Sequence, residues 1–482
     1  SQIRVDSAPY VWYPPADATA SPEAWWRVVL ESNTNVWDYN GTNFIFRPVP
    51  LRYYVNDDGP TGIDVYTTAV GSPTNRGYVS NSPLHSIQAV LDRYQLAGGD
   101  EILVDTGVYA LSNSVAITLL NSGNADEQVK ITGSTNWADG GSWLQAAAGM
   151  TDPAFLLFGA HDVGISTFRM TEFFNGISSS ESSARCTLSD LDIQGSTGSG
   201  VSISLANDIR LERVLIREGA TVGLSVGSAK LSMEGCVLWS NRSSAIAATG
   251  SELQMSNSVI VASGPGQYCY LFGTNVAVTA DYNDLHVTNG AEIASVHGLA
   301  YQKLPQWVIG TPQNQDRHSL STDPQFHDPA NGDFHPRSVA GRYALGVGWT
   351  NDVSATNLPD FSPLIDMGAP RSAWSNEPSA HGSRRNIGLY GNTTQASKSN
   401  PGQWLLAVTA MSGGLVEGAF HLTWGYGGIL SNAAVQLDYS YDNGNSWLRI
   451  NSNAVGACEF YWQSDLKKSD GSERWPTSPG AR

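Results

Sequence analysis

A repeat of about 22 residues in the middle of the chain restricts the fold more than any other feature. Four short segments can be laid over one another, and within each segment apolar and polar residues alternate with the period of a β-strand. The segments are Thr187–Ile193, Arg210–Ile216, Ser232–Leu238 and Gln254–Ile260. Their first apolar residues are Leu188, Leu211, Met233 and Met255, and we expect a fifth at Val278, which gives spacings of 23, 22, 22 and 23.

A second short strand follows the first in each repeat, after small polar residues or glycine. These second strands are Val201–Leu205, Val222–Val226, Ser244–Ala247 and Tyr268–Phe272. One unit of this length cannot bury its own apolar face, whereas stacked units share a continuous core and form long parallel sheets. No unit contains the 3.6-residue period of a helix. The sequence therefore predicts an all-β fold, a parallel β-helix or solenoid.

Flanking segments are expected to cover both ends of this solenoid. Ser82 and Pro83 have the residue types of an N-cap and a first helical residue, and the apolar residues between 87 and 94 recur at helical spacing. We expect that helix to plug the N-terminal mouth. The segment 323–391 is rich in Asp, Pro and Gly and is expected to cover the other mouth with irregular coils. The β-helix with its end caps is assigned to residues 51–395.

The charge of the chain disfavours nucleic acid as a partner. The 482 residues include 27 Lys and Arg against 44 Asp and Glu, a formal net charge of -17, and binding to phosphates needs clustered cations. No apolar run is long enough to suggest a membrane span. The four cysteines, Cys186, Cys236, Cys269 and Cys458, form no closely spaced pair. We therefore expect buried free thiols rather than a zinc cluster.

One group of charged residues has the composition that a polysaccharide lyase needs, namely carboxylates beside a basic residue on an exposed sheet face. The group is Asp190, Asp192, Arg210, Glu212, Arg213, Arg217 and Glu218. Strand alternation points Asp192 outward, and the matching positions on the next repeats are Leu215, Val237 and Val259. Because that column is apolar, we expect a loop or another subunit to cover it. The charged residues are then interpreted as ion pairs across neighbouring strands.

A second polar group, His327, Asp328, Asp333 and His335, falls in turns of the segment expected to cover the solenoid. Asp in turns usually accepts hydrogen bonds from its own backbone. We therefore expect no cofactor here; a calcium site is the alternative that these residues leave open, and they favour zinc less than calcium. We assign no catalytic, cofactor-binding or metal-ligating residue from the sequence.

Several motifs resemble those of secreted bacterial right-handed β-helix proteins of the pectate-lyase-like superfamily. The motifs are Tyr53–Asp57, Asp64–Thr68, Pro83–Leu91, Gly99–Tyr109, Asp323–His335, Ser362–Gly368 and Arg385–Gly391. The resemblance covers roughly residues 51–395 and implies a right-handed β-helix in an extracellular or cell-surface setting. It does not imply one activity, because the superfamily includes lyases, hydrolases, epimerases and non-catalytic surface proteins.

The two ends of the chain resemble parts of one β-sandwich module. Residues 440–447 match the Asp-box pattern S-x-D-x-G-x-x-W, which is structural in sialidase-like families, and the segment 396–482 is similar to the front of an immunoglobulin-like module. The segment 1–50 resembles the closing strands of such a module, in Trp26–Ser32, Asn35–Asp38 and Thr42–Phe46. The residues expected at the junction of the two parts are Trp26, Val28, Leu30, Val36, Phe44, Phe46, Trp424 and Trp447.

These two parts would flank a rod of about ten coils, roughly 50 Å long at 4.8 Å per strand layer. The front part on one chain would meet the back part on the next chain, which is a heterologous contact. A heterologous contact that does not close generates a filament. We therefore expect a structural protein that assembles head to tail with copies of itself by strand addition. Three alternatives remain open. The chain is a piece of a covalent tandem array, the N-terminal segment packs along its own rod, or the protein acts on polysaccharide, as a lyase or hydrolase or as a non-catalytic glycan-binding protein.

Overall fold

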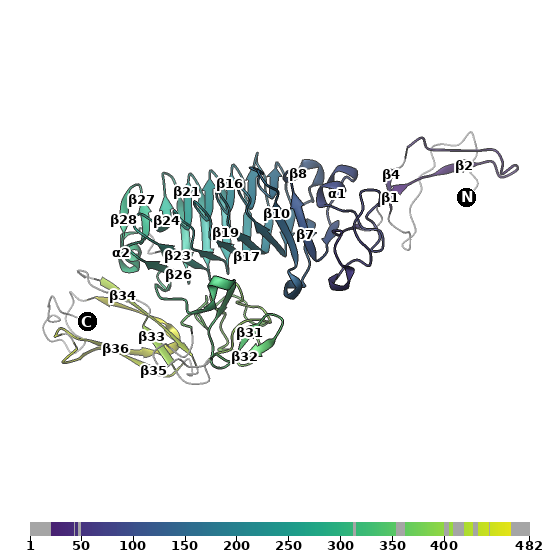
Figure 1. Cartoon of the computed structure of the whole chain (residues 1–482). Helices are drawn as coiled ribbons and strands as arrows, with labels where there is room; N and C mark the ends of the chain where they lie inside the picture. Colours follow the sequence, from purple (N-terminus) through teal and green to yellow (C-terminus); the bar gives the residue numbers. More distant parts are fainter. Residues whose placement is uncertain are drawn as a thin grey trace. The chain divides into compact units, whose positions relative to one another are not determined.

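The computed structural model describes residues 21–42, 44–46, 50–311, 315–352, 362–399, 404–407, 419–427, 432–442 and 444–463. They belong to two compact units, treated separately here: Ser1–Tyr109 with Val115–Trp143 and Ala160–Thr167, and Ala110–Ser114 with Leu144–Gly159 and Phe168–Arg482. The described strands form a β-solenoid of about 6 turns, fewer than the ten expected (Figure 1). The short 3-10 turns are η1 (Thr61–Ile63), η2 (Leu119–Asn121), η3 (Trp137–Asp139), η4 (Pro329–Asn331) and η5 (Val455–Ala457).

The first unit begins with an antiparallel hairpin. Strand β1 (Ser21–Ala24) pairs with β4 (Phe44–Phe46), and β2 (Arg27–Val29) pairs with β3 (Trp37–Tyr39). Four parallel strands follow, β5 (Arg52–Val55), β6 (Glu101–Val104), β9 (Val129–Thr132) and β12 (Val163–Ser166), each hydrogen-bonded to the next. Strand β8 (Val115–Thr118) belongs to the same unit, whereas β7 (Gly107–Leu111) and β10 (Ser142–Ala146) include residues of both units.

Helix α1 (Ile87–Arg93) begins four residues later than the sequence predicts. Its N-cap is Ser86, whose hydroxyl accepts a hydrogen bond from the Ala89 amide at 3.2 Å. The prediction of Ser82 and Pro83 was wrong, because the Pro83 carbonyl accepts the Ser72 amide at 3.1 Å and belongs to the preceding loop. The expected apolar stripe is confirmed, since Ile87, Val90 and Leu91 are all buried.

The second unit contains most of the solenoid, built from two parallel sheets. One sheet stacks β13 (Phe168–Thr171), β15 (Thr187–Gln194), β17 (Ile209–Arg217), β19 (Lys230–Glu234), β22 (Glu252–Ser256) and β25 (Ala277–Asp281), with β20 (Val237–Trp239), β23 (Val259–Ser263) and β26 (Asp284–Thr288) continuing from β17. The other sheet stacks β11 (Phe155–Phe158), β14 (Ile177–Ser180), β16 (Val201–Ser204), β18 (Leu224–Gly227), β21 (Ile246–Thr249), β24 (Tyr268–Phe272), β27 (Glu292–Val296) and, antiparallel, β28 (Leu299–Tyr301).

The register of the first sheet confirms the predicted repeat at four positions and corrects the fifth. Leu188, Leu211, Met233 and Met255 are successive partners in the ladder. Met255 then pairs with Ala280, whereas Val278 pairs with Leu253. The prediction failed because this turn of the solenoid is longer. Its partnered positions Val259 and Tyr270 are eleven residues apart, where Val237 and Ile246 in the previous turn are nine apart.

The covering segment, which we define as residues 320–352 and 362–390, packs on the outer face of the strands. The predicted outward column is confirmed, since Asp192, Leu215, Val237 and Val259 are successive partners. The last three are buried in one apolar cluster, whose other members include Leu320, Phe326, Phe334, Leu364, Met367 and Ile387. The expectation that 323–391 covers the mouth of the solenoid was therefore wrong. The covering segment includes β29 (Phe326–Asp328), β30 (Asp333–Pro336), β31 (Arg342–Ala344) and β32 (Gly348–Thr350).

Helix α2 (Leu304–Gly310) packs on the last turn of the solenoid instead. Trp307 is buried, with its ring centroid 5.5 Å from Tyr270 and 6.2 Å from Phe272 of β24. Tyr301 of β28 lies edge-on to the same ring at 5.5 Å. Aromatic rings that meet in this way bury a large apolar area at one place. The sequence analysis did not identify this helix.

The C-terminal module, within residues 404–463, contains two small antiparallel sheets. One is β33 (Trp404–Ala407), β34 (Ala419–Gly427) and β37 (Glu459–Gln463), and the other is β35 (Ala434–Tyr439) with β36 (Leu448–Ala454). Side chains from both sheets share one cluster, in which Tyr439 and Ile450 are buried and six further apolar residues are only partly buried.

Candidate functional site

The hairpin formed by β2 and β3 presents apolar side chains on both of its faces. Arg27 pairs with Tyr39, Val28 with Asp38 and Val29 with Trp37. Because successive side chains of a strand point to opposite sides, the hairpin has two distinct faces. We call Trp25, Arg27, Val29, Trp37 and Tyr39 the aromatic face, and Val28, Leu30, Val36 and Asp38 the aliphatic face.

The aliphatic face is open to solvent. Val28 is 60% exposed, Leu30 is 50% exposed and Val36 is 53% exposed. A tight turn places Leu30 opposite Val36, because the Leu30 amide donates to the Val36 carbonyl at 2.8 Å. An isolated two-stranded hairpin is marginally stable in water, and contiguous exposed apolar residues usually mark an interaction surface. The arrangement is therefore typical of a surface that is completed by a partner.

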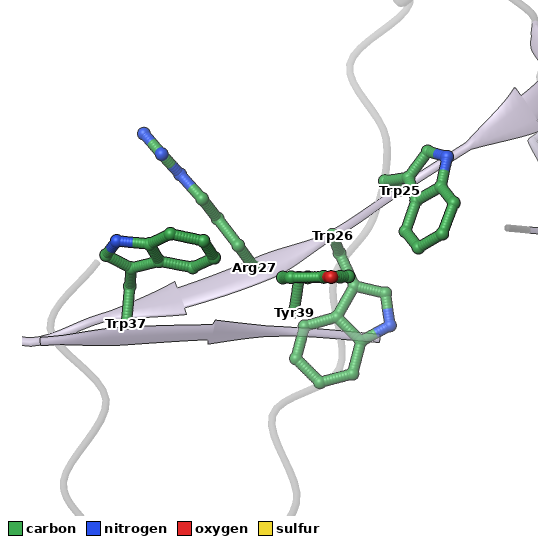
Figure 2. A pocket seen from close by; sticks show the side chains of 5 residues that line it. All are labelled: Trp25, Trp26, Arg27, Trp37 and Tyr39. Atoms are coloured by element: carbon green, nitrogen blue, oxygen red, sulfur yellow. The ribbon is translucent and has the colours of Figure 1, made fainter. Parts of the chain in front are cut away.

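The aromatic face lines an open hollow of about 560 Å³ with the side chains of Trp25, Arg27, Trp37 and Tyr39 (Figure 2). The ring centroids of Trp37 and Tyr39 are 5.7 Å apart in a stacked arrangement, and Trp25 meets Tyr39 edge-on at 5.6 Å. All three rings are more than half exposed. Trp26 also lines the hollow, so this tryptophan is accessible from the aromatic side.

The residues expected at an assembly junction fall into three groups. Trp26, Val28, Leu30 and Val36 lie together on the hairpin and are all exposed. In the C-terminal module, Trp447 is 57% exposed, whereas Trp424 is 6% exposed and belongs to the interior. Phe46 of β4 is partly buried, and the side chain of Phe44 lies outside the described residues.

The sequence analysis missed the aromatic face, although a signal was present. Trp25 and Arg27 are two residues apart, as are Trp37 and Tyr39, which is the spacing of one strand face. The residues chosen from the sequence, Val28 and its neighbours, belong to the opposite phase of the same alternation. Both phases are apolar, so the pattern alone did not show that the rings gather on one side.

The charged group on the solenoid forms ion pairs between neighbouring turns. Arg213 holds Asp190 with two hydrogen bonds of 2.6 and 2.8 Å, and Arg217 holds Asp192 with two of 2.9 and 3.1 Å. Burial lowers the pKa of Arg217, but its bonds to Asp192 outweigh this and the net shift is upward. Both carboxylates are thus engaged by a guanidinium. The interpretation of this group as cross-strand ion pairs agrees with these contacts.

The two remaining acids of the group, Glu212 and Glu218, also lie beside arginines. Glu212 pairs with Arg210 and lies 3.9 Å from Arg213, and Arg217 donates a hydrogen bond to Glu218 at 3.4 Å. Glu234 of the next turn accepts a hydrogen bond from Arg385 of the covering segment at 2.7 Å and lies 3.7 Å from Arg210. Glu212 and Glu234 are register partners, so the neighbouring arginines offset the repulsion between two like charges. The hydrogen bond between Arg385 and Glu234 links the covering segment to the solenoid.

The histidine and aspartate group of the covering segment is organised around Arg342. Its guanidinium bonds Asp333 at 2.8 Å and Asp352 at 3.1 Å, and also reaches His327. His335 contacts Asp333 at 2.7 Å, and burial lowers the pKa of His335. A buried cation at this position disfavours a metal ion. No group of three His, Cys, Asp or Glu suited to a metal occurs among the described residues.

The turn at residues 440–447 is held by its own side chains. Asp442 accepts hydrogen bonds from the Ser446 amide at 2.8 Å and from the Ser446 hydroxyl at 2.6 Å, which lower the pKa of Asp442. The Gly444 amide donates to the Ser440 hydroxyl at 2.7 Å. Asp442 therefore has a structural role in this turn.

Asp284 is a fully buried carboxylate under the covering segment. Its Oδ1 accepts the Thr322 amide at 3.0 Å, its Oδ2 has no partner among the described residues, and burial raises its pKa to about 7. Because the folded state keeps a proton that the unfolded chain releases near pH 4, Asp284 lowers the stability as the pH rises from about 4 to 7.

We expect Asp284→Asn to stabilise the protein at pH 8 and to have little effect at pH 4. Each unit of pKa shift corresponds to about 1.4 kcal/mol, so the shift of about three units sets an upper limit of about 4 kcal/mol on the gain above pH 7. Urea denaturation at both pH values measures it. The matched change Asp58→Asn, at an exposed loop position, should alter neither midpoint. An equal effect of Asp284→Asn at both pH values would contradict this assignment.

The four cysteines are free and buried, in agreement with the sequence analysis. Across the residues that the structure describes, no helix combines the length and apolar character that crossing a membrane requires. Comparisons with protein-family models, with curated proteins and with solved structures found no match.

Proposed function

We propose that this chain is an extracellular structural protein, a right-handed β-solenoid that assembles head to tail with copies of itself. The observation that carries the proposal is the solvent-exposed aliphatic face of the hairpin, Val28, Leu30 and Val36. Covering such a face with apolar surface stabilises an association by roughly 25 cal/mol for each Å² removed from water. The hairpin supplies both that area and unpaired strand edges.

The C-terminal module is the surface that this hairpin would complete. We propose that the module is an incomplete immunoglobulin-like sandwich, because most of the apolar residues in its shared cluster are only partly buried. Leu405 on β33 and Tyr461 on β37, the two outer strands of its three-stranded sheet, are each more than half exposed. Added strands would bury these residues and occupy sheet edges that otherwise invite association.

A contact of this type joins two different surfaces of the chain and is therefore heterologous. Each chain then offers one hairpin and one module, so addition continues at both ends unless the assembly closes into a ring. Helix α1 would close the N-terminal end of each solenoid with its apolar stripe. A covalent array would need the same pairing between neighbouring repeats of one longer chain.

The size of the assembly tests the proposal directly. Sedimentation velocity and negative-stain microscopy of the intact chain should show species larger than one chain, increasing with protein concentration. A single monomeric species at every concentration would contradict it.

A further inference from the structure

We infer that a pH-sensitive contact centred on His318 holds the C-terminal module on the solenoid and loosens as the pH rises. His318 lies just before the covering segment, and histidine side chains change charge between about pH 5 and 8. The contact joins two parts of one chain. The inference therefore does not depend on whether copies of the chain assemble.

The first observation is that both ring nitrogens of His318 face carboxylate oxygens. Nδ1 lies 2.7 Å from Oδ2 of Asp281, the last residue of β25. Nε2 lies 3.4 Å from Oε2 of Glu459, the first residue of β37 in the C-terminal module. A neutral imidazole donates from one nitrogen, whereas the charged ring donates from both. Only the protonated ring therefore satisfies both carboxylates at once.

The second observation is that the solenoid fixes the position of the imidazole. The ring stacks on Tyr282 with a centroid distance of 4.8 Å and planes 6° apart, and the His318 amide donates to Oδ1 of Asp281 at 2.6 Å. After loss of a proton, we expect the ring to keep its shorter bond to Asp281. Nε2 then presents a lone pair to Glu459, and two acceptors that face each other repel. The contact with the module is the one that weakens.

The neighbouring cations give Glu459 less support than His318 does. Arg317 is 3.9 Å from Oε2 of Glu459 and its side chain is 34% exposed, so this attraction is weak. Arg384 of the covering segment lies over the Tyr282 ring at 5.6 Å and donates to the Gly368 carbonyl at 2.6 Å.

Other titratable groups near the contact do not account for a change of charge at neutral pH. Both carboxylate oxygens of Asp316 accept hydrogen bonds from other side chains, Oδ1 from Ser319 at 2.6 Å and Oδ2 from Trp307 at 3.0 Å. Burial raises the pKa of Tyr282 to about 12 and also raises the pKa of the Cys458 thiol, so both stay uncharged. The group that changes charge at this contact is the histidine.

A contact that does not titrate limits the size of the effect. The Thr423 hydroxyl of β34 donates to the Arg317 carbonyl at 3.4 Å, so a second link between the module and the solenoid remains at high pH. We therefore expect a shift between docked and undocked modules rather than complete release.

Distances between two spin labels, measured by pulsed electron paramagnetic resonance, test the inference on the full chain. Gln254→Cys on β22 and Ser452→Cys on β36 place the labels at exposed positions of the solenoid and the module, whereas the four native thiols are buried. Diluting labelled chains into unlabelled protein removes distances between copies, so the result is independent of assembly. We expect one narrow distance at pH 6, and a ratio of docked to undocked modules about two- to fivefold lower at pH 8.

Two substitutions should each remove the difference between the two pH values. His318→Gln has no charge to lose, and the amide of Glu459→Gln can accept from the charged ring or donate to the neutral one. His161→Gln is the matched control, because His161 pairs with Asp162 at 2.9 Å in the first unit. It should respond to pH like the parent.

The same variants separate His318 from buried acids that titrate in this range. Burial raises the pKa of both Asp284 and Glu377 to about 7, and neither acid is altered by the substitutions. A parent whose distances are the same at pH 6 and pH 8, or narrower at pH 8, would overturn the inference. So would a pH response that survives in either His318→Gln or Glu459→Gln, or one that is lost in His161→Gln.

Discussion

The double substitution Val28→Lys with Val36→Glu is expected to convert the assembled protein into monomers. Both residues lie on the aliphatic face, where docking against another chain would have to remove the new charges from water. The hairpin itself should survive, because position 28 is opposite Asp38 and a lysine there can form a cross-strand ion pair. Sedimentation velocity of parent and variant at equal concentration gives the result.

The matched control places the same two substitutions at other exposed valines. Val108 and Val347 are 48% and 76% exposed and lie outside the hairpin, so Val108→Lys with Val347→Glu changes the composition identically. This control should sediment like the parent. If the hairpin variant also sediments like the parent, the aliphatic face is not the assembly surface.

Phe334→Ala is expected to produce the largest loss of stability in the covering segment, about 3–5 kcal/mol. Phe334 is fully buried, with its ring 5.7 Å from Trp239 of the solenoid and 5.2 Å from Phe326. Removing it would leave a cavity against the apolar column of Leu215 and Val237. The midpoint of urea denaturation, followed by tryptophan fluorescence, measures the loss.

Phe158→Ala is the control for the same change of residue at an exposed position. Phe158 ends β11 and is half exposed, so its truncation should cost far less than that of Phe334. Similar losses for the two variants would show that the covering segment contributes little to the folded state, contrary to the packing described here.

The solenoid could be predicted because its period is repeated and its strands alternate strictly. The register from Leu188 to Met255 and the outward column from Asp192 to Val259 both follow from that alternation. The prediction failed at Val278, where a longer turn containing Gly264 and Gly266 interrupts the period. A repeat predicts register only between insertions.

The covering segment could not be placed from its sequence, because irregular coil carries no period. The apolar column did predict that a loop or another subunit covers the outer face. Phe326 and Phe334, however, lie among turn residues, and their sequence context does not show that they pack on this column. The predicted start of helix α1 was wrong for a related reason. Ser82 and Ser86 are both suitable N-caps, and the backbone contacts of Pro83 with a distant loop decide between them.

The strands of the hairpin were predicted, but the sequence did not show which side chains gather on each of its two faces. Either phase of its alternation is apolar, and the separation of rings from aliphatic residues depends on the register of Arg27 with Tyr39. That register follows from the turn at 30–36, whose hydrogen bonds a strand pattern does not reveal. The strand pattern therefore suggested one apolar surface, whereas the hairpin has an aromatic face and a separate aliphatic face.

The most direct test of head-to-tail assembly is to mix two chains that are each defective at one end. One carries Val28→Lys with Val36→Glu in the hairpin, and the other carries Leu405→Glu on the outer strand β33 of the C-terminal module. Each should be monomeric alone, and an equimolar mixture should form a dimer of one copy of each, because one intact hairpin and one intact module remain. A mixture that stays monomeric, or a single variant that forms dimers by itself, would contradict the account.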